Sequence, residues 1–437
     1  MKLPVHGHLA KVAKKVSHHP SLFAFIAFWA VLFHLNFHSS AKLPETLRII
    51  AQDFDQYYQG GVVAATGKWN ELYPKSIPEN LSPTQAILCP SISNELLRRG
   101  SPIRTKWIFP PPLAVFFTPL SVFNYGTALR LWILFLILSS AELLLITERL
   151  FVRFGFSNVT TQTLVLAMGF SIGMRNAIAG GNITPVVGIG TALAMSGLLS
   201  EKPCKAVAGF FLSGATKGTS AFWVPLLIVR REWRTICAGI SAVIVFFAIG
   251  FAAGVRMESY SEFISKVIPA GRGTLYTTNW NVGFPSMVVN FIGADKINSR
   301  ELVTTFSIVS GIILICCYAM SSRYDVRQDR RLVPLCLVVS LVLFNFFSNI
   351  SWPYYSTQFF PLVPVCLALC GHRFRCLLVL VLFPYLFDPG ILRAVSKIDG
   401  LSNVKHLATI GSAIWLVWAM LELSRLSKLR SGRIWPQ

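Results

Sequence analysis

The feature that most restricts this chain is a series of apolar runs, each close to the width of a lipid bilayer. They cover residues 21–37, 235–255, 303–320, 332–347 and 406–421. About 20 apolar residues span a bilayer core as a helix, and soluble cores do not need such runs. Charged residues form only 14% of the chain, against roughly a quarter in soluble domains. The sequence therefore predicts an all-α polytopic membrane protein with about 9 to 12 transmembrane helices.

The chain carries a net charge of +21, which in a soluble protein would suggest a nucleic-acid partner. Here the basic residues stand in short blocks between apolar runs, as do the residues that fix membrane topology. Such blocks also contact lipid headgroups. We therefore expect these basic blocks to contact the lipid bilayer, and we expect no nucleic-acid partner.

The basic blocks divide the chain into a membrane domain and two tails. Residues 1–20 and 425–437 are basic cytoplasmic tails, and residues 21–424 form the transmembrane domain. Residues 38–108 are polar and rich in proline, so they are predicted to be an extracytoplasmic first loop that carries short helices. Residues 256–302 form a second large loop on the same side. No convincing cleavage site follows the first apolar run, so we interpret it as an uncleaved first helix.

The middle of the chain allows two topologies. Residues 109–123 are rich in proline and residues 204–229 are interrupted by glycine and lysine. If both segments are re-entrant, all the basic blocks reach the cytoplasm, and this is the topology that we prefer. If both segments span instead, Gly180–Asn182 moves to the cytoplasmic side. Broken helices at membrane depth need protein or a watery cavity around them, so we expect a cavity that opens to the outer face.

The first outer loop contains a candidate base, Asp53. In a helix, Asp53 would share one face with Gln56 and Tyr57, and with small residues that allow close packing. Those small residues are Gly60, Gly61 and Ala64. Asp55 would lie about 200° away around the helix. We therefore expect Asp55→Asn to impair function less than Asp53→Asn does. From spacing alone, Asp53 could equally be a catalytic group or the N-cap of the helix.

Several other residues are candidates for a substrate site on the outer side. Lys217 interrupts an apolar segment with small residues around it, which suits an anion, although a lysine at a helix end can also snorkel to the surface. Arg272 and Asn279 lie in the second outer loop. The segment from Trp352 to Tyr355 lies at another outer boundary, where aromatic residues are usually part of the interfacial belt. Together with Asp53, these groups would suit an anionic, lipid-linked sugar.

Five stretches, taken in chain order, resemble glycosyltransferase family 87, the alpha-mannosyltransferase-like membrane enzymes of the GT-C fold. The first is Asp53-Phe-Asp-Gln-Tyr-Tyr58, followed by Gly67 and Leu72-Tyr-Pro74. The others are residues 109–120 with Trp132, Gly181-Asn182, Ala215-Thr-Lys217 with Arg230-Arg231, and Ser351-Trp-Pro-Tyr-Tyr355. The chain departs from the family pattern at Tyr354, where the family has histidine, at Asn279-Trp-Asn281, and in lacking the glutamine before Asn182.

The resemblance implies a GT-C-type helix bundle and an inverting transferase that uses a polyprenyl-phosphate sugar. It implies that Asp53 is the catalytic base, and we expect Lys217 and Arg272 to bind the donor phosphate. The residues expected to bind substrate are Tyr57, Tyr58, Asn182, Asn279, Trp352, Tyr354 and Tyr355. A phosphate leaving group needs stabilising cations but no acid partner. We expect no metal and no cofactor, because no pair of carboxylates with metal-ligand spacing stands out in the sequence.

The expected function is transfer of mannose to an extracytoplasmic glycan or glycolipid, at the outer face of a bacterial inner or plasma membrane. Two alternatives stay open. A lipid-linked sugar flippase would explain the broken helices and Lys217, but it predicts two related halves that the sequence does not show. A polysaccharide polymerase or ligase would rely on an outer-loop arginine such as Arg272 rather than on Asp53.

Overall fold

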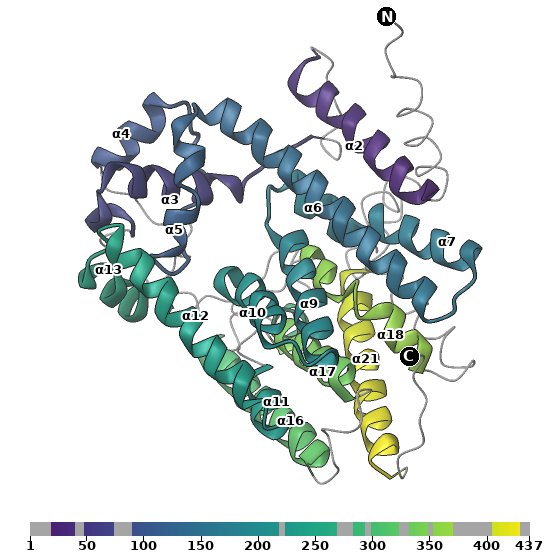
Figure 1. The fold of residues 1–437 in the computed structure, drawn as a ribbon. Helices are drawn as coiled ribbons and strands as arrows, with labels where there is room; N and C mark the ends of the chain where they lie inside the picture. Colours follow the sequence, from purple (N-terminus) through teal and green to yellow (C-terminus); the bar gives the residue numbers. More distant parts are fainter. Residues whose placement is uncertain are drawn as a thin grey trace, which may run out of the picture.

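The computed structural model describes most of the chain, and the described parts consist of helices and the turns between them (Figure 1). No β-strand occurs within them, which confirms the predicted all-α class. The described residues are 19–39, 48–73, 90–217, 223–268, 283–292, 299–322, 332–347, 353–369 and 404–428.

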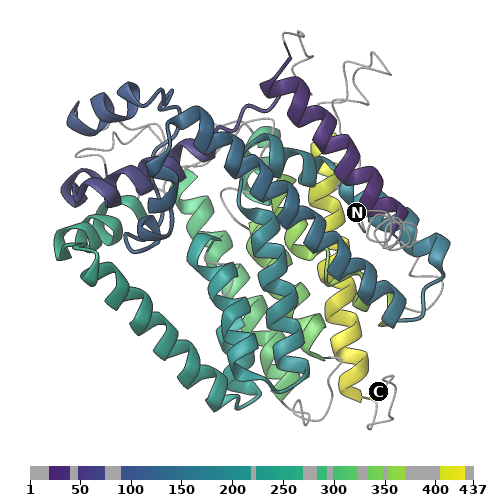
Figure 2. The same ribbon diagram turned by 45° about the horizontal axis from the view of Figure 1, so that its top comes forward.

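Within these ranges, three helices are long and apolar enough to cross a membrane: α2 (Pro20–Phe37), α6 (Tyr125–Arg153) and α12 (Trp233–Ala252). Large apolar side chains stand exposed along α12, as expected for a surface that faces lipid. The predicted total of about 9 to 12 spans remains a prediction. Further apolar helices pack beside these three (Figure 2). They are α7 (Asn158–Gly169), α8 (Ile172–Ala179), α9 (Thr184–Leu199), α10 (Pro203–Lys217), α11 (Val224–Val229), α15 (Phe284–Ile292), α16 (Ser299–Ser322), α17 (Leu332–Phe347), α18 (Val363–Leu369) and α21 (Val404–Lys428).

Short helices gather at one end of the bundle and form what we call the short-helix layer (Figure 1). It consists of α3 (Phe54–Thr66), η2 (Trp69–Glu71), α4 (Pro90–Arg98), α5 (Leu113–Phe116), η4 (Thr118–Val122), α13 (Met257–Glu262) and η6 (Phe263–Val267). The Trp69 indole N–H donates to the Ala253 carbonyl at 3.0 Å, and the Ser259 hydroxyl donates to the Trp69 carbonyl at 3.1 Å. The described parts of the two predicted outer loops therefore lie together.

All three long helices have one end at the short-helix layer. Asn36, near the end of α2, accepts a hydrogen bond from the Ile49 amide, and α6 begins beside α3 at Tyr125. The α12 helix ends at the layer through Ala253. The opposite ends of α6 and α12 carry Arg149, Arg153 and Arg230, Arg231, Arg234. The ends of α6 and α12 away from the layer therefore each carry a block of basic residues.

The first interrupted segment of the middle region, residues 109–123, does not form an ordinary span. The α5 and η4 helices have only four and five residues and pack against α3. A Cβ added at Gly61 of α3 would lie 2.3 Å from the Phe117 carbonyl oxygen, so glycine is needed for this contact. The turn at residues 180–182 lies beside residues 51–53 of the first loop. This arrangement agrees with the topology that keeps Gly180–Asn182 on the side of that loop.

The α9 and α10 helices pack closely against each other and antiparallel. Small residues face each other along the contact, and this lets two backbones touch in the absence of a hydrophobic driving force. The facing pairs are Gly197 with Ala206, Ala194 with Gly209, and Gly190 with Ser213. A Cβ added at Gly209 would lie 2.2 Å from the backbone nitrogen of Ala194. The two helices would have to separate to accommodate it.

We therefore expect Gly209→Ala and Gly239→Ala to shift stability in opposite directions. Alanine favours a helix over glycine by up to about 1 kcal/mol, and Gly239 of α12 has open space around it. Gly239→Ala should leave the melting temperature in detergent unchanged or slightly raised. Gly209→Ala should lower it, because overpacking costs about 1–3 kcal/mol. Equal melting temperatures for the two variants would contradict the close packing of α9 on α10.

Candidate active site at the start of helix α3

Asp53 stands immediately before α3, and its carboxylate does not cap that helix. Its backbone amide donates to the Gly180 carbonyl at 2.9 Å. Its Oδ2 accepts a hydrogen bond from Asn182 Nδ2 at 2.6 Å. The side chain is half-buried. Asp53 therefore occupies the N-cap position of α3, but its side chain makes no capping hydrogen bond and is held against the turn between α8 and α9.

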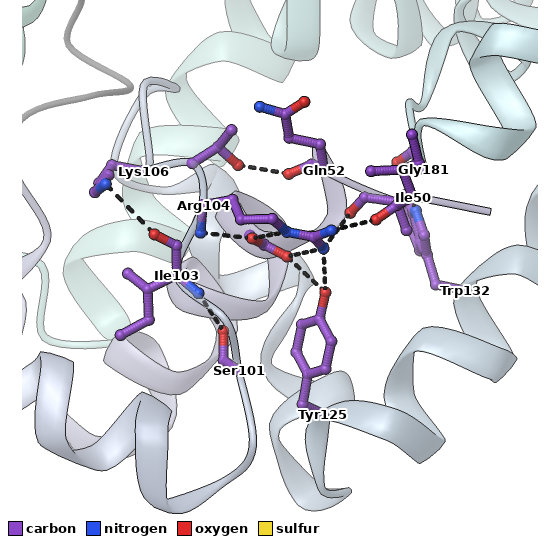
Figure 3. Close-up of polar contacts among 12 residues, drawn as sticks. Ile50, Gln52, Ser101, Ile103, Arg104, Lys106, Tyr125, Trp132 and Gly181 are labelled. Atoms are coloured by element: carbon purple, nitrogen blue, oxygen red, sulfur yellow. Dashed lines mark hydrogen bonds and ion pairs between the residues drawn. The ribbon is translucent and has the colours of Figure 1, made fainter. Parts of the chain in front are cut away.

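The α8–α9 turn is shaped to hold Asp53. Gly181 has a φ of +73°, and a Cβ there would lie 3.1 Å from Phe54 Cβ, so a side chain would be strained and crowded. The Trp132 indole N–H donates to the Gly181 carbonyl at 2.8 Å (Figure 3). Asn182 is buried, and its Oδ1 accepts from the Thr184 amide at 3.1 Å. The Asn182 amide is thereby oriented with its NH₂ group toward Asp53.

Tyr57 lies one turn beyond Asp53 and presents a buried hydroxyl. Its ring stacks on Phe109 and Phe117, with centroid distances of 5.5 and 4.9 Å. Its hydroxyl has no hydrogen-bond partner in the structure as described. Burial raises the pKa of the Tyr57 hydroxyl well above its ordinary value, and the nearby Asp53 carboxylate raises it further, against a smaller lowering by the Ile183 backbone. Tyr57 is therefore a neutral donor beside Asp53.

Tyr355 comes to this region from the second half of the chain. It belongs to η8 (Pro353–Phe359), which packs against α8 and α9, the two helices that flank the Asn182 turn. A Cβ added at Gly188 of α9 would lie 2.8 Å from the Thr357 carbonyl oxygen, so η8 lies directly on α9. The structure thus brings Asp53, Tyr57, Asn182 and Tyr355 together, although up to about 300 residues separate them along the chain.

Lys217 is the last residue of α10. Its side chain lies outside the described residues, but its backbone position follows from the register of α9 and α10. One further turn beyond the contact of Gly190 with Ser213 brings Lys217 level with Val186, in the first turn of α9. Asn182 lies just before that turn. The position of Lys217 is therefore compatible with a role beside Asp53.

The other predicted residues divide into two groups. Tyr58 points away from Asp53: its hydroxyl donates to the Phe123 carbonyl at 2.7 Å, and its ring meets Tyr125 edge to face. It therefore has a structural contact where the sequence predicts a substrate contact. Arg272, Asn279 and Trp352 lie outside the described residues, and for Tyr354 only the backbone, in η8, is described.

Asp55 occupies the opposite side of α3, as the helical spacing predicts, and is fully buried. It accepts hydrogen bonds from Arg104 Nε at 3.0 Å, from the Arg104 amide at 2.7 Å and from the Tyr125 hydroxyl at 2.5 Å. Arg104 also donates to the Ile50 carbonyl at 2.6 Å and to the Tyr125 hydroxyl at 3.0 Å (Figure 3). Sequence reasoning missed Arg104, because nothing in its spacing distinguishes it from other loop cations. This network fixes the segment that leads into Asp53.

A search of curated protein sequences finds no match to this chain. A family model, that of glycosyltransferase family 87, matches residues 107–347, which is more than half of the chain. The match includes Asn182 and Lys217, whereas Asp53 and Tyr355 lie before and after it. With its apolar helices, the chain is a membrane protein, and it belongs to glycosyltransferase family 87.

Proposed function

We propose that this glycosyltransferase moves mannose from a polyprenyl-phosphate donor to a glycan or glycolipid acceptor, with inversion at the anomeric carbon. The observation that carries the proposal is the position of Asp53. Its carboxylate turns away from its own helix and is held by Asn182 at 2.6 Å, between the first loop and the α8–α9 turn. A carboxylate that is fixed by one amide and half-buried suits a general base.

The proposed reaction needs a single carboxylate. The acceptor hydroxyl oxygen bonds to the anomeric carbon as its proton passes to Asp53, and the bond from that carbon to the phosphate oxygen breaks. The leaving group departs as a polyprenyl phosphate, whose low pKa makes an acid partner unnecessary. Negative charge grows on that phosphate, and we assign its stabilisation to Lys217 and Arg272. This chemistry requires no metal and no cofactor.

The remaining substrate contacts are assigned to residues on the elements that surround Asp53. Tyr57 offers a neutral donor hydroxyl, and Asn182 and Tyr355 lie on the elements that surround it. Asn279, Trp352 and Tyr354 keep their proposed roles on the strength of sequence alone. Tyr58 supports the proposal only indirectly, because its hydroxyl is bonded to the Phe123 carbonyl and so helps to fix α3.

The distribution of charge supports an active site on the outer face. Basic residues collect at the ends of α6 and α12 that lie away from Asp53, and basic loop residues mark the cytoplasmic side of a membrane protein. Asp53 itself lies in the short-helix layer at the other end. We therefore propose an extracytoplasmic site in a bacterial inner or plasma membrane, where lipid-phosphate sugars are suitable donors.

A direct test compares two radiolabelled donors with the purified protein in proteoliposomes. We expect label from polyprenyl-phosphate mannose, but not from GDP-mannose, to enter the lipid or glycan fraction of host membranes supplied as acceptor. Other polyprenyl-phosphate hexoses serve as controls for the identity of the sugar. Transfer from the nucleotide sugar would refute the donor class. Movement of the intact lipid-linked sugar across the bilayer without cleavage would favour a flippase instead.

A further inference from the structure

Two buried amide side chains stand out in the second half of the chain, Gln358 in η8 and Asn345 in α17. Their exposed fractions are 0% and 5%. Neither the nitrogen nor the oxygen of either amide has a hydrogen-bond partner. Among the side-chain amides that the structure describes, only these two have both the nitrogen and the oxygen buried without a partner. Unpaired buried polar groups are costly, and they call for an explanation in function.

Both amides lie on elements that border the Asp53 site. The η8 helix packs against α8, α9 and α17. The rings of Phe344 and Tyr355, neighbours of the two amides in sequence, lie 6.4 Å apart between α17 and η8. Ser356 and Thr184, on η8 and α9, add further buried hydroxyls without a partner. Several buried polar groups without a partner therefore lie on η8, α17 and the start of α9.

The chemistry of a primary amide restricts the ligand. A phosphate oxygen could use only the NH₂ group, and a cation could use only the carbonyl oxygen. Sugar hydroxyls donate and accept, so adjacent hydroxyls on one ring can satisfy both halves of an amide. We propose that Gln358 and Asn345 bind the hydroxyls of a pyranose ring at the Asp53 site, and that they help to select the sugar. This inference rests on the proposed function, because it assumes that the site receives a sugar.

The test measures binding apart from catalysis. The melting temperature of the purified full-length protein is recorded without ligand, with polyprenyl phosphate, with polyprenyl-phosphate mannose and with methyl α-mannoside. For wild type, we expect a mannosyl ligand to raise the melting temperature beyond the effect of the sugar-free lipid. Gln358→Leu and Asn345→Leu should keep the response to polyprenyl phosphate but bind the mannosyl ligand roughly tenfold more weakly. A loss confined to the mannosyl lipid assigns the pair to the donor sugar, and one confined to methyl α-mannoside assigns it to the acceptor.

A control separates recognition from folding. Ser340 of α17 is also buried, but its hydroxyl donates to the Cys336 carbonyl at 2.8 Å, so Ser340→Ala should leave the sugar response intact. Without ligand, the leucine variants should melt no lower than wild type, because they remove unpaired polar groups. Three results would each overturn the inference. They are a lower melting temperature of both leucine variants without ligand, an unchanged sugar response in both variants, and the absence of a sugar response in wild type. Sugar-dependent binding by a wild-type protein that transfers nothing would refute only the proposed function.

Discussion

Replacing Asp53 with asparagine is expected to reduce the rate of sugar transfer by about 10²- to 10⁴-fold, the range that a positioned general base contributes. Asparagine has nearly the same shape but cannot take the acceptor proton. Its carbonyl oxygen can still accept the hydrogen bond that Asn182 now gives to Asp53 at 2.6 Å. The backbone bond to the Gly180 carbonyl is also kept. The lost rate should therefore appear in kcat, while the melting temperature stays close to that of wild type.

The neighbouring residue offers a matched control for this variant. The Gln52 side chain is exposed, and only its backbone carbonyl is used, as acceptor for the Thr105 hydroxyl. Gln52→Ala should therefore transfer sugar at nearly the wild-type rate. Transfer would be followed with labelled polyprenyl-phosphate mannose under single-turnover conditions, which separate the chemical step from product release. If Asp53→Asn retained more than about a tenth of wild-type kcat, Asp53 could not be the base.

The local features of α3 could be predicted from sequence, because they depend on helical periodicity alone. Small residues at Gly60 and Gly61 indicated close packing, and a Cβ at Gly60 would in fact lie 2.4 Å from the Trp107 ring. The separation of Asp53 from Asp55 also follows the helical period. Periodicity could likewise have divided Tyr57 from Tyr58, which point about 100° apart, and assigning both to the substrate site ignored this.

Contacts between distant segments could not be derived in this way. Asn182 meets Asp53 across 129 residues, and Arg104 meets Asp55 across 49. A single sequence shows the order of such residues but not which loop folds against which turn. The unpaired amides of Gln358 and Asn345 were missed for a related reason. Asn345 lies in an apolar run and Gln358 follows two small polar residues, and only the packing of η8 and α17 shows that both are buried without a partner.

The same substitution at Asp55, two residues away, should lower the stability of the fold and leave the chemical step largely intact. Asp55→Asn is expected to destabilise the fold by about 3 kcal/mol, since it breaks hydrogen bonds to a fully buried charged group. The Asp55 carboxylate is buried against Arg104 and Tyr125. A neutral amide in its place leaves Arg104 without its counter-charge. It also turns an N–H group toward the Arg104 and Tyr125 donors, where a hydrogen-bond acceptor is needed. Sequence spacing predicts that this variant impairs transfer less than Asp53→Asn does, and the structure adds an expected loss of stability that spacing alone does not show.

The Asp55 variant should therefore lose melting temperature first and transfer activity only as the protein unfolds. A double-mutant cycle with Arg104→Leu isolates the ion pair, because the double variant leaves no unpaired charge. We expect the double variant to melt higher than the sum of the two single losses predicts. At a temperature where Asp55→Asn is still folded, its kcat should exceed that of Asp53→Asn by at least tenfold. If Asp55→Asn instead melted like wild type but failed to transfer sugar, the roles assigned to the two carboxylates would have to be exchanged.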